Sequence, residues 1–269
     1  MTQQLFSALL KHWRRRRGWS QLDLALAADV SARHLSFLES GRAHPSEEMV
    51  LRLMNTLEVP LREQNEILRA ASFSARFPEP ELDAIHPSVE LAIARMCRQQ
   101  EPFPLTVMTA GYDIVRANDA AATIFSHFTA EPERLKMPLN LFDQVFDPRL
   151  GRTFIKNWAQ LGHHMTSRLH REALHREGDT RLWALLERVL AYPDVPRDWR
   201  QPDFSSVNEP TGSLVLQRGS LTLRFFTTVT AFSAPQQVTL EELLIESYFP
   251  LDDETEAACE TLVSASLPK

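Results

Sequence analysis

The chain has 269 residues, of which 43% are hydrophobic and 24% charged, and its formal net charge is −6 at pH 7. This size allows two domains with hydrophobic cores, and the composition excludes only unusual classes of protein. No run approaches the ~20 apolar residues that a membrane span needs, and the N-terminal basic run follows a short apolar stretch, the reverse of a secretory signal. We therefore expect a cytoplasmic protein with no membrane partner.

Charge is distributed unevenly along the chain. Residues 1–44 carry seven Lys or Arg and three Asp or Glu, a net charge of +4, so the remainder sums to −10. A basic first segment on an acidic body favours a nucleic-acid contact surface in that segment. The alternative is that its densest part, Arg14 to Arg17, is only a solvated helix face. Cys97 and Cys259 are the only cysteines, and they are far apart, so neither a disulfide framework nor a zinc site is expected.

The first seventy residues predict five short helices. Leu5, Leu9 and Trp13 recur every fourth residue in the first helix, and Gly18 ends it. Ser20 is a natural N-cap for the second helix, QLDLALAA. These signals begin a compact all-helical domain, which we assign to residues 1–72.

The rest of this domain shows the same kinds of helix-capping and turn signals. A turn at Asp29 and Val30 leads to Ser31, the N-cap of a third helix that ends at Gly41, a plausible left-handed residue. PSEEMVLRLMNTL and LREQNEILRAA predict the fourth and fifth helices. Residues 73–103 then predict a linker, because FPEPELDAIHP has three prolines in eleven residues, before a helix in SVELAIARMCRQQ.

Residues 104–269 predict a second, mixed domain. LTVMTAGYDIVRANDAAATIF indicates two strands joined by a turn at Ala110 and Gly111, then a helix after Asn118. Helices are expected in LNLFDQVF, over residues 153–175 and in DTRLWALLERVLAY. SLVLQRGSLTLRFFTTVTAF predicts a hairpin broken at Arg218 and Gly219, and ELLIESYFP predicts a further strand. The expected fold class is α+β: a five-helix domain followed by an α+β domain with an antiparallel sheet.

The third helix carries two stripes. Leu35 and Leu38 should be buried, whereas Arg33, Ser36, Phe37 and Ser40 share another face. Two helices joined by a tight turn, with polar groups near the start of the second, fit the ~12 Å major groove of DNA. Ala32, Arg33 and Phe37 would then face base edges. Two alternatives remain: Phe37 folding back over its own domain, and Arg33 contacting phosphate or only solvent.

This stretch resembles the helix-turn-helix of the XRE (Cro/repressor-like) family. The resemblance rests on RRRRGWSQLDLALAADVSARHLSFLESGRAHPS. It implies an ion pair between Arg14 and Glu39, phosphate contacts at Gln21 and Arg42, and a homodimer on double-stranded DNA. The expected DNA-binding set is Gln21, Ser31, Ala32, Arg33, His34, Ser36, Phe37 and Arg42. Asp29 departs from the family's Gly, but Asp tolerates left-handed backbone better than most residues.

The resemblance extends over nearly the whole chain. RHLSFLESGRAHPS, NLFDQVFDP, RTFIKNW, TLEELLIESYFP and DDETE together look like the MmyB-like branch of bacterial regulators. That branch implies a PAS-like ligand-binding domain in the C-terminal half. The order of two strands, helices, a hairpin and a further strand is consistent with it.

No catalytic or metal chemistry is predicted. His163, His164, His170 and His175 fall in one expected helix without an i, i+4 pair, and no phosphate loop, nucleophile elbow or paired-carboxylate motif is present. We therefore expect no cofactor, no metal and no enzyme activity. Aromatic side chains in the second domain favour an apolar, acyl-like effector such as a fatty acid, although each could instead fill an ordinary core. Candidate ligand-binding residues are Phe125, Phe128, Trp158, His164, Arg168, Trp183 and Phe226.

These observations favour a sequence-specific transcription regulator whose PAS-like domain binds a small effector that alters DNA binding. In a second hypothesis that domain is a ligand-free dimerisation or protein-interaction module. A more distant third is an enzyme fused to a DNA-binding domain. A cavity between the sheet and the helices of residues 118–190, with His164 and Arg168 as polar anchors, would favour the first. The alternative for each of these two residues is a surface salt bridge.

Overall fold

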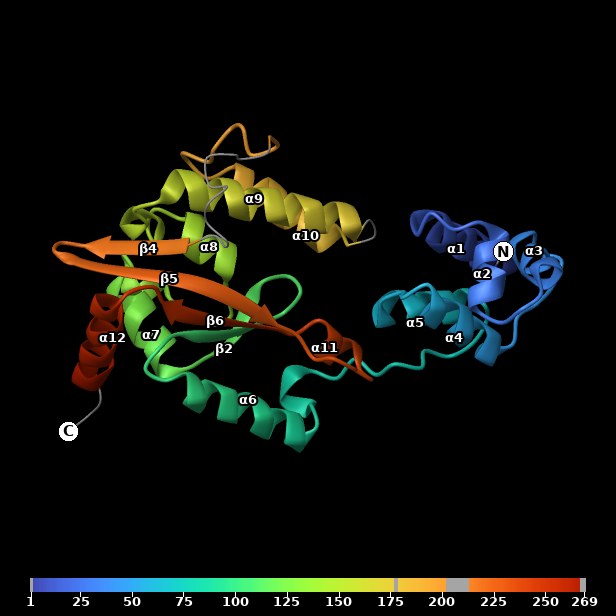
Figure 1. Ribbon diagram of the computed structural model, residues 1–269, viewed down its shortest axis with the longest axis horizontal. Coiled ribbons are helices and arrows are strands. Elements are labelled where there is room, and N and C mark those ends of the chain that lie inside the picture. Colours follow the sequence, from blue (N-terminus) through green and yellow to red (C-terminus); the bar gives the residue numbers. More distant parts are fainter. Residues whose placement is uncertain (1, 177–178, 202–212, 267–269) are drawn as a thin grey trace. The chain divides into compact units, whose positions relative to one another are not determined.

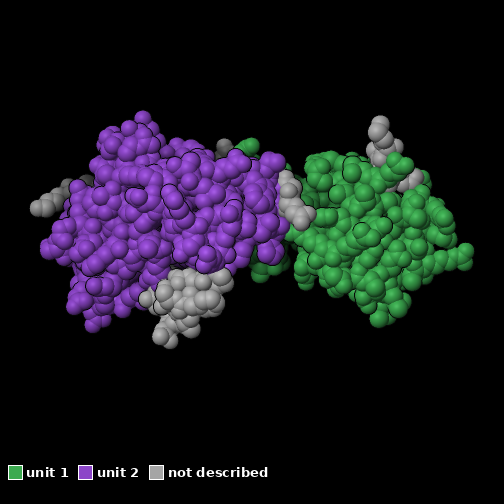
Figure 2. Space-filling model, turned by 90° about the horizontal axis from the view of Figure 1, so that it is seen from above, with its two compact units in different colours: residues 1–85, 232–241 green, residues 86–231, 242–269 purple. Residues whose placement is uncertain are grey.

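The computed structural model describes residues 2–176, 179–201 and 213–266, and the chain divides into two compact units. Unit 1 contains residues 1–85 and 232–241, and unit 2 contains residues 86–231 and 242–269 (Figure 2). The chain thus passes between the units at three points. The ten residues 232–241 lie within the region 104–269 that the sequence analysis treated as one domain.

Unit 1 contains the five predicted helices. They are α1 (Thr2–Arg16), α2 (Gln21–Ala27), α3 (Ala32–Glu39), α4 (Glu47–Thr56) and α5 (Leu61–Ala70) (Figure 1). The same unit also contains the 3₁₀ turn Leu82–Ala84 and the short α11 (Val238–Glu241). Of the predicted repeat on α1, Trp13 is buried and Leu9 is half-buried, but Leu5 is 54% exposed. Phe6 and Leu10 complete the buried face, because α1 packs on α3 and α5.

Local signals set the ends of these helices as predicted. Ser20 and Ser31 accept hydrogen bonds as the N-caps of α2 and α3, and Gly18 ends α1 with φ +72°. Asp29 adopts φ +52° in the turn between α2 and α3, so the turn does form without the family's glycine. Gly41, at φ +71°, closes α3: its N–H donates to Leu38 O, and the next N–H reaches Phe37 O.

Unit 2 is built on one antiparallel sheet of six strands in the order β3-β2-β1-β6-β5-β4. The strands are β1 (Leu105–Met108), β2 (Asp113–Ala117), β3 (Leu139–Asn140), β4 (Ser213–Arg218), β5 (Leu221–Thr230) and β6 (Leu244–Pro250). β6 is central, and four consecutive residues, 245–248, are buried on its two faces. The predicted α+β fold class is confirmed.

Helices cover the sheet of unit 2. They are α6 (Pro87–Gln100), α7 (Asp119–His127), α8 (Leu141–Phe146), α9 (Trp158–His175), α10 (Thr180–Leu190) and α12 (Asp253–Ser266). Figure 1 shows α9 and α10 on one side of the sheet and α6 on the other. No helix among the described residues is both long and apolar enough to span a membrane.

The long helix expected over residues 153–175 begins only at Trp158. Asn157 explains the difference, because its side chain pairs with the edge strand β4. Its Nδ2 donates to Ser213 O at 2.7 Å, and its Oδ1 accepts from Val215 N at 3.0 Å. The backbone of residues 155–156 also bonds to β4, so this stretch is extended rather than helical.

Candidate functional site

A bidentate ion pair joins α1 to the end of α3. Arg14 Nε lies 2.6 Å from Glu39 Oε1, and Arg14 Nη2 lies 2.9 Å from Glu39 Oε2. The same guanidinium donates to Trp19 O at 2.7 Å, and Gln21 Nε2 donates to Glu39 Oε2 at 2.8 Å. The Glu39 side chain is only 3% exposed. One carboxylate therefore gathers donors from α1 and α2 and fixes the last turn of α3.

The surroundings of Glu39 keep it ionised. Burial alone raises the pKa of this carboxyl, but hydrogen bonds from Arg14 and Gln21 outweigh burial and hold the pKa below its usual value. The hydrogen bond to Glu39 also raises the pKa of Arg14. Ser7 adds a further tie, because its Oγ donates to Leu38 O at 2.6 Å. The end of α3 is thus held by charge and by hydrogen bonds.

The opposite end of α3 faces outward. Ser31, Ala32 and Arg33 are exposed at its first turn, while Leu35 and Leu38 are fully buried. The Arg33 guanidinium lies 5.4 Å from the centroid of the Phe37 ring. This contact turns two side chains of the predicted stripe toward each other on one surface.

The other expected DNA-binding residues fall in two groups. His34, Ser36 and Phe37 are half-buried along α3, and Arg42 is exposed just beyond it. Gln21 instead places its amide on Glu39. Sequence reasoning missed this role of Gln21, because its partner lies on another helix.

The arginine run is divided between structural and exposed roles. Arg14 is bound to Glu39, and Arg17 donates to Leu57 O and Glu58 O at the C-terminal end of α4, at 2.7 and 2.8 Å. Arg16 lies over the ring of Trp13, and Arg15 is exposed. The run is therefore neither a uniform contact surface nor a uniform solvated face.

Unit 2 contains a cavity of about 300 Å³ between the sheet and the helices α8 and α9. Apolar side chains and a few polar ones share its wall. Its lining residues are Leu141, Val145, Leu161, His164, Met165, Arg168, Leu214, Thr227, Val229, Glu246 and Tyr248. A smaller hollow of about 40 Å³ shares part of this wall and includes Phe125 and Phe128. A mainly apolar wall with a few polar side chains is the usual composition of a small-molecule pocket.

Two hydrogen-bonded groups of polar side chains lie at the cavity, one formed by Glu246 and Tyr248 and the other by Arg168 with Tyr112 and Glu172 behind it. Tyr248 Oη donates to Glu246 Oε2 at 2.9 Å, and the Arg168 guanidinium contacts the Tyr112 hydroxyl at 3.1 Å and Glu172 Oε1 at 3.3 Å. Tyr112 also donates to Glu172. These groups come from the turn before β2, from α9 and from β6, and each finds a hydrogen-bond partner, as buried polar groups require.

Burial shifts the protonation of these groups. It raises the pKa of Glu246 despite the nearby Tyr248 hydroxyl and Arg168 charge, and it also raises the pKa of Tyr248. Burial lowers the pKa of His164, and the Arg168 charge lowers it further. Burial favours a lower pKa for Arg168, but Tyr112 and the nearby carboxylates raise it overall. Arg168 therefore remains a cation, held by Tyr112 and Glu172.

The predicted ligand-binding residues divide between the cavity and other contacts. His164 and Arg168 line the larger cavity, and Phe125 and Phe128 line the smaller hollow. The other three lie elsewhere in the described structure: Trp158 donates to Asp194 O at 2.8 Å, Trp183 packs near His170, and Phe226 stacks on Phe249. Phe226 neighbours Phe225 and Thr227 on a strand, so its side chain points to the opposite face of the sheet.

Sequence reasoning missed Glu246, Tyr248 and Tyr112. Residues 243, 245, 247 and 249 alternate in ELLIESYFP, which drew attention to one face of β6 while its other face lines the cavity. A carboxyl within a strand rich in apolar and aromatic residues was the available signal. The histidines of α9 are dispersed: among the described residues no group of three or more His, Cys, Asp or Glu could hold a metal ion.

Two family models match this chain. A helix-turn-helix model matches residues 10–64, and the model described as MmyB-like transcription regulator ligand binding domain matches residues 89–262. The first range contains the Arg14 and Glu39 pair, and the second contains the whole lining of the cavity.

Curated relatives carry the same type of description. Uncharacterized HTH-type transcriptional regulators from Mycobacterium bovis and Mycobacterium tuberculosis are 28% identical to this chain over 136 residues, which is 51% of this chain and 47% of each relative. The chain thus spans about half the length of the curated relatives it matches.

Glu39→Ala should lower the free energy of unfolding of the helical unit by about 3–5 kcal/mol, because it leaves the Arg14 guanidinium buried without its carboxylate. Chemical denaturation followed by circular dichroism measures this loss. Glu48→Ala is the matched control, because Glu48 forms an exposed i, i+4 pair with Arg52 and should change stability by less than about 1 kcal/mol. Equal stability of the two variants would contradict a structural role for the buried pair.

The contribution of Glu39 should also depend on pH. Its pKa is lower in the folded chain, so its stabilising effect is complete above the ordinary glutamate pKa of about 4.3 and is lost as the pH falls through the lower, folded value. The stability difference between the wild type and Glu39→Gln should therefore shrink below about pH 4. Denaturation curves between neutral and acidic pH measure it, and a difference that stays constant over this range would count against the assignment.

Proposed function

The chain belongs to the helix-turn-helix transcription regulators with an MmyB-like ligand-binding domain, and on this premise we propose that it reads DNA through the first turns of α3. The observation that carries the proposal is the exposure of Ala32 and Arg33, with Phe37 half-buried beside Arg33, on a helix whose far end is tied to α1. A rigidly held helix with exposed polar groups near its N-terminus fits the major groove.

The two arginines of this surface have different roles in the proposal. Arg33, beside the apolar ring of Phe37, offers a bidentate donor to guanine next to a surface for a thymine methyl. Arg42, which follows the helix, and Gln21, at the start of α2, contact phosphate. The regulator acts as a homodimer on an inverted repeat whose half-sites lie about 34 Å apart, or a multiple of that distance.

The cavity of unit 2 takes a small acyl-like effector. Its apolar wall, with Leu141, Leu161 and Met165, accommodates the hydrocarbon body, and Arg168 receives an acidic head group. Glu246 and Tyr248, which bond to each other and whose pKa values burial raises, lie on the same wall of the cavity. Occupancy alters DNA binding to the extent that the effector binds two states of the regulator with different affinities.

Arg33→Ala should relax sequence preference at one base pair, at a cost of about 1–3 kcal/mol there, whereas Arg42→Ala should weaken binding to all sequences alike and lower the salt dependence. Fluorescence anisotropy against a panel of single-base operator variants separates the two. DNase I footprinting of the same operator tests the dimer, which should protect two half-sites. An Arg33 variant that loses affinity uniformly, or protection of one asymmetric half-site at all concentrations, would contradict this arrangement.

Decanoate should bind the full-length protein, and Arg168→Met should weaken that binding at least about tenfold, because the variant keeps the side-chain length but removes the charge that meets the head group. Isothermal titration calorimetry measures the affinity, and native mass spectrometry of the purified protein identifies any bound acid. Arg171→Met is the matched control, since Arg171 is exposed on the same helix. Equal binding by both variants would remove Arg168 from the site, and a cavity that takes no acyl ligand would leave the second domain as a dimerisation module.

A further inference from the structure

The floor of the cavity is the stem of the hairpin formed by β5 and β6. Thr227 and Val229 line the cavity from β5, and Tyr248 and Glu246 line it from β6. The ladder pairs Thr227 with Tyr248 and Val229 with Glu246, and it ends one pair later at Thr230 and Ile245. Four cavity residues are therefore direct cross-strand partners at the end of the ladder.

The connection between these two strands belongs to the DNA-binding unit. Residues 232–241 cluster with residues 1–85, and α11 packs against α5. Val238 is fully buried there, and its N–H donates to Pro78 O at 2.9 Å, while Thr239 Oγ1 donates to Pro80 O at 2.6 Å. The two strands that line the cavity are thus connected by a segment that is anchored in unit 1.

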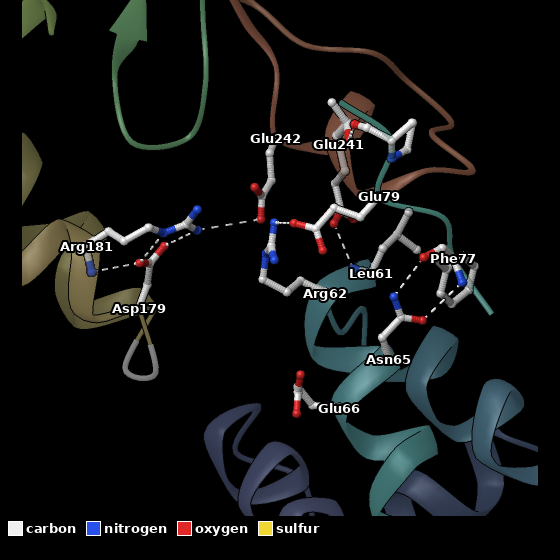
Figure 3. A network of polar contacts seen from close by, with 12 residues as sticks. Leu61, Arg62, Asn65, Glu66, Phe77, Glu79, Asp179, Arg181, Glu241 and Glu242 are labelled. Atoms are coloured by element: carbon white, nitrogen blue, oxygen red, sulfur yellow. Dashed lines mark hydrogen bonds and ion pairs between the residues drawn. The ribbon is translucent and has the colours of Figure 1, made fainter. Parts of the chain in front are cut away.

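Glu241 completes the N-terminus of α5. The N-cap residue of this helix, Pro60, makes no side-chain cap hydrogen bond. Glu241 Oε2 instead accepts the N–H of Leu61 at 2.7 Å, although the two residues are 180 positions apart in the sequence (Figure 3). A carboxylate at a helix N-terminus satisfies a backbone donor and complements the helix dipole.

The capped helix is part of the core that holds the reading helix. Ile67 and Leu68 of α5 are buried in the same cluster as Leu35 and Leu38 of α3. Asn65 secures the segment beyond α5, because its side chain donates to Phe77 O and accepts from Phe77 N (Figure 3). The α11 segment is hydrogen-bonded to this same stretch, at the carbonyl groups of Pro78 and Pro80. A change at Glu241 therefore acts on an element that packs beneath α3.

We infer that residues 232–241 form a regulatory cap, through which occupancy of the cavity changes the stability of α5 and with it DNA binding. The inference rests on the proposed effector function and adds its route. A ligand that displaces Val229 or Glu246 alters the end of the ladder from which the cap extends. Strengthening or weakening the Glu241 hydrogen bond then shifts the DNA-binding unit, and by reciprocity DNA shifts effector affinity.

The first measurement is amide hydrogen exchange of the full-length protein. Glu241→Ala should speed exchange of the Leu61 amide and the first turn of α5 about five- to tenfold, the loss expected for a helix cap. Gln236→Ala, at an exposed position of the same segment, is the matched control and should leave these amides unchanged. Unchanged exchange at Leu61 in Glu241→Ala would overturn the cap.

The second measurement perturbs the cavity and reads α5. Added decanoate and, separately, the cavity-filling substitution Val145→Phe on α8 should each change α5 exchange and operator affinity in the wild type and in Gln236→Ala. Both responses should disappear in Glu241→Ala. If decanoate has no effect, but Val145→Phe changes α5 exchange and operator affinity only when Glu241 is present, the regulatory cap is supported and only the acyl effector is contradicted. Responses that persist in Glu241→Ala, or no α5 response to either perturbation, overturn the cap while leaving the effector proposal to its own binding test.

A double variant separates transmission from simple loss of stability. Pro60 has φ −58° and ψ 151°, an extended conformation that suits an N-cap, so Pro60→Asp supplies a local cap to α5. Combined with Glu241→Ala it should restore slow exchange and basal operator affinity but not the response to decanoate or Val145→Phe. Recovery of that response in the double variant would show that Glu241 only stabilises α5 and would overturn the regulatory role.

Discussion

The ion pair between Arg14 and Glu39 is the interaction on which the DNA-binding unit depends. Its carboxylate collects hydrogen bonds from α1 and α2 at the end of α3, so the orientations of three helices meet at one buried charge. A buried charge is tolerated only with such partners, and loss of one partner leaves the other uncompensated. This constraint fixes one end of α3 and leaves the first turn, with Arg33, free to face outward.

A second constraint lies in two neighbouring strands of unit 2. Strands β5 and β6 form the floor of the cavity, and the segment between them contains residues 232–241, which belong to unit 1. Glu246 and Tyr248 sit on β6 at the cavity wall, where apolar side chains would pack more cheaply. Buried polar groups with shifted pKa values in a cavity wall are typical of binding sites.

Local sequence patterns predicted where helices and strands begin and end better than they predicted which side chains contact one another in the fold. Ser20, Ser31 and Gly41 marked helix ends correctly because capping is a matter of hydrogen bonds within a few residues. The aromatic candidates succeeded less well: Trp183 and Phe226 have the volume for a ligand wall, but their contacts lie elsewhere. Composition reports how much apolar surface a segment offers, and only packing decides which way it points.

The sequence by itself determined the five-helix unit, the antiparallel sheet domain and the family, because periodicity, caps and motif spacing are local properties of the chain. It also placed Arg14 opposite Glu39, through the family pattern. Only the tertiary structure divided the arginine run between burial and solvent, turned Gln21 inward and brought Glu241 to Leu61. Those outcomes depend on contacts between residues far apart in sequence, whose geometry exists only after the helices and strands have packed.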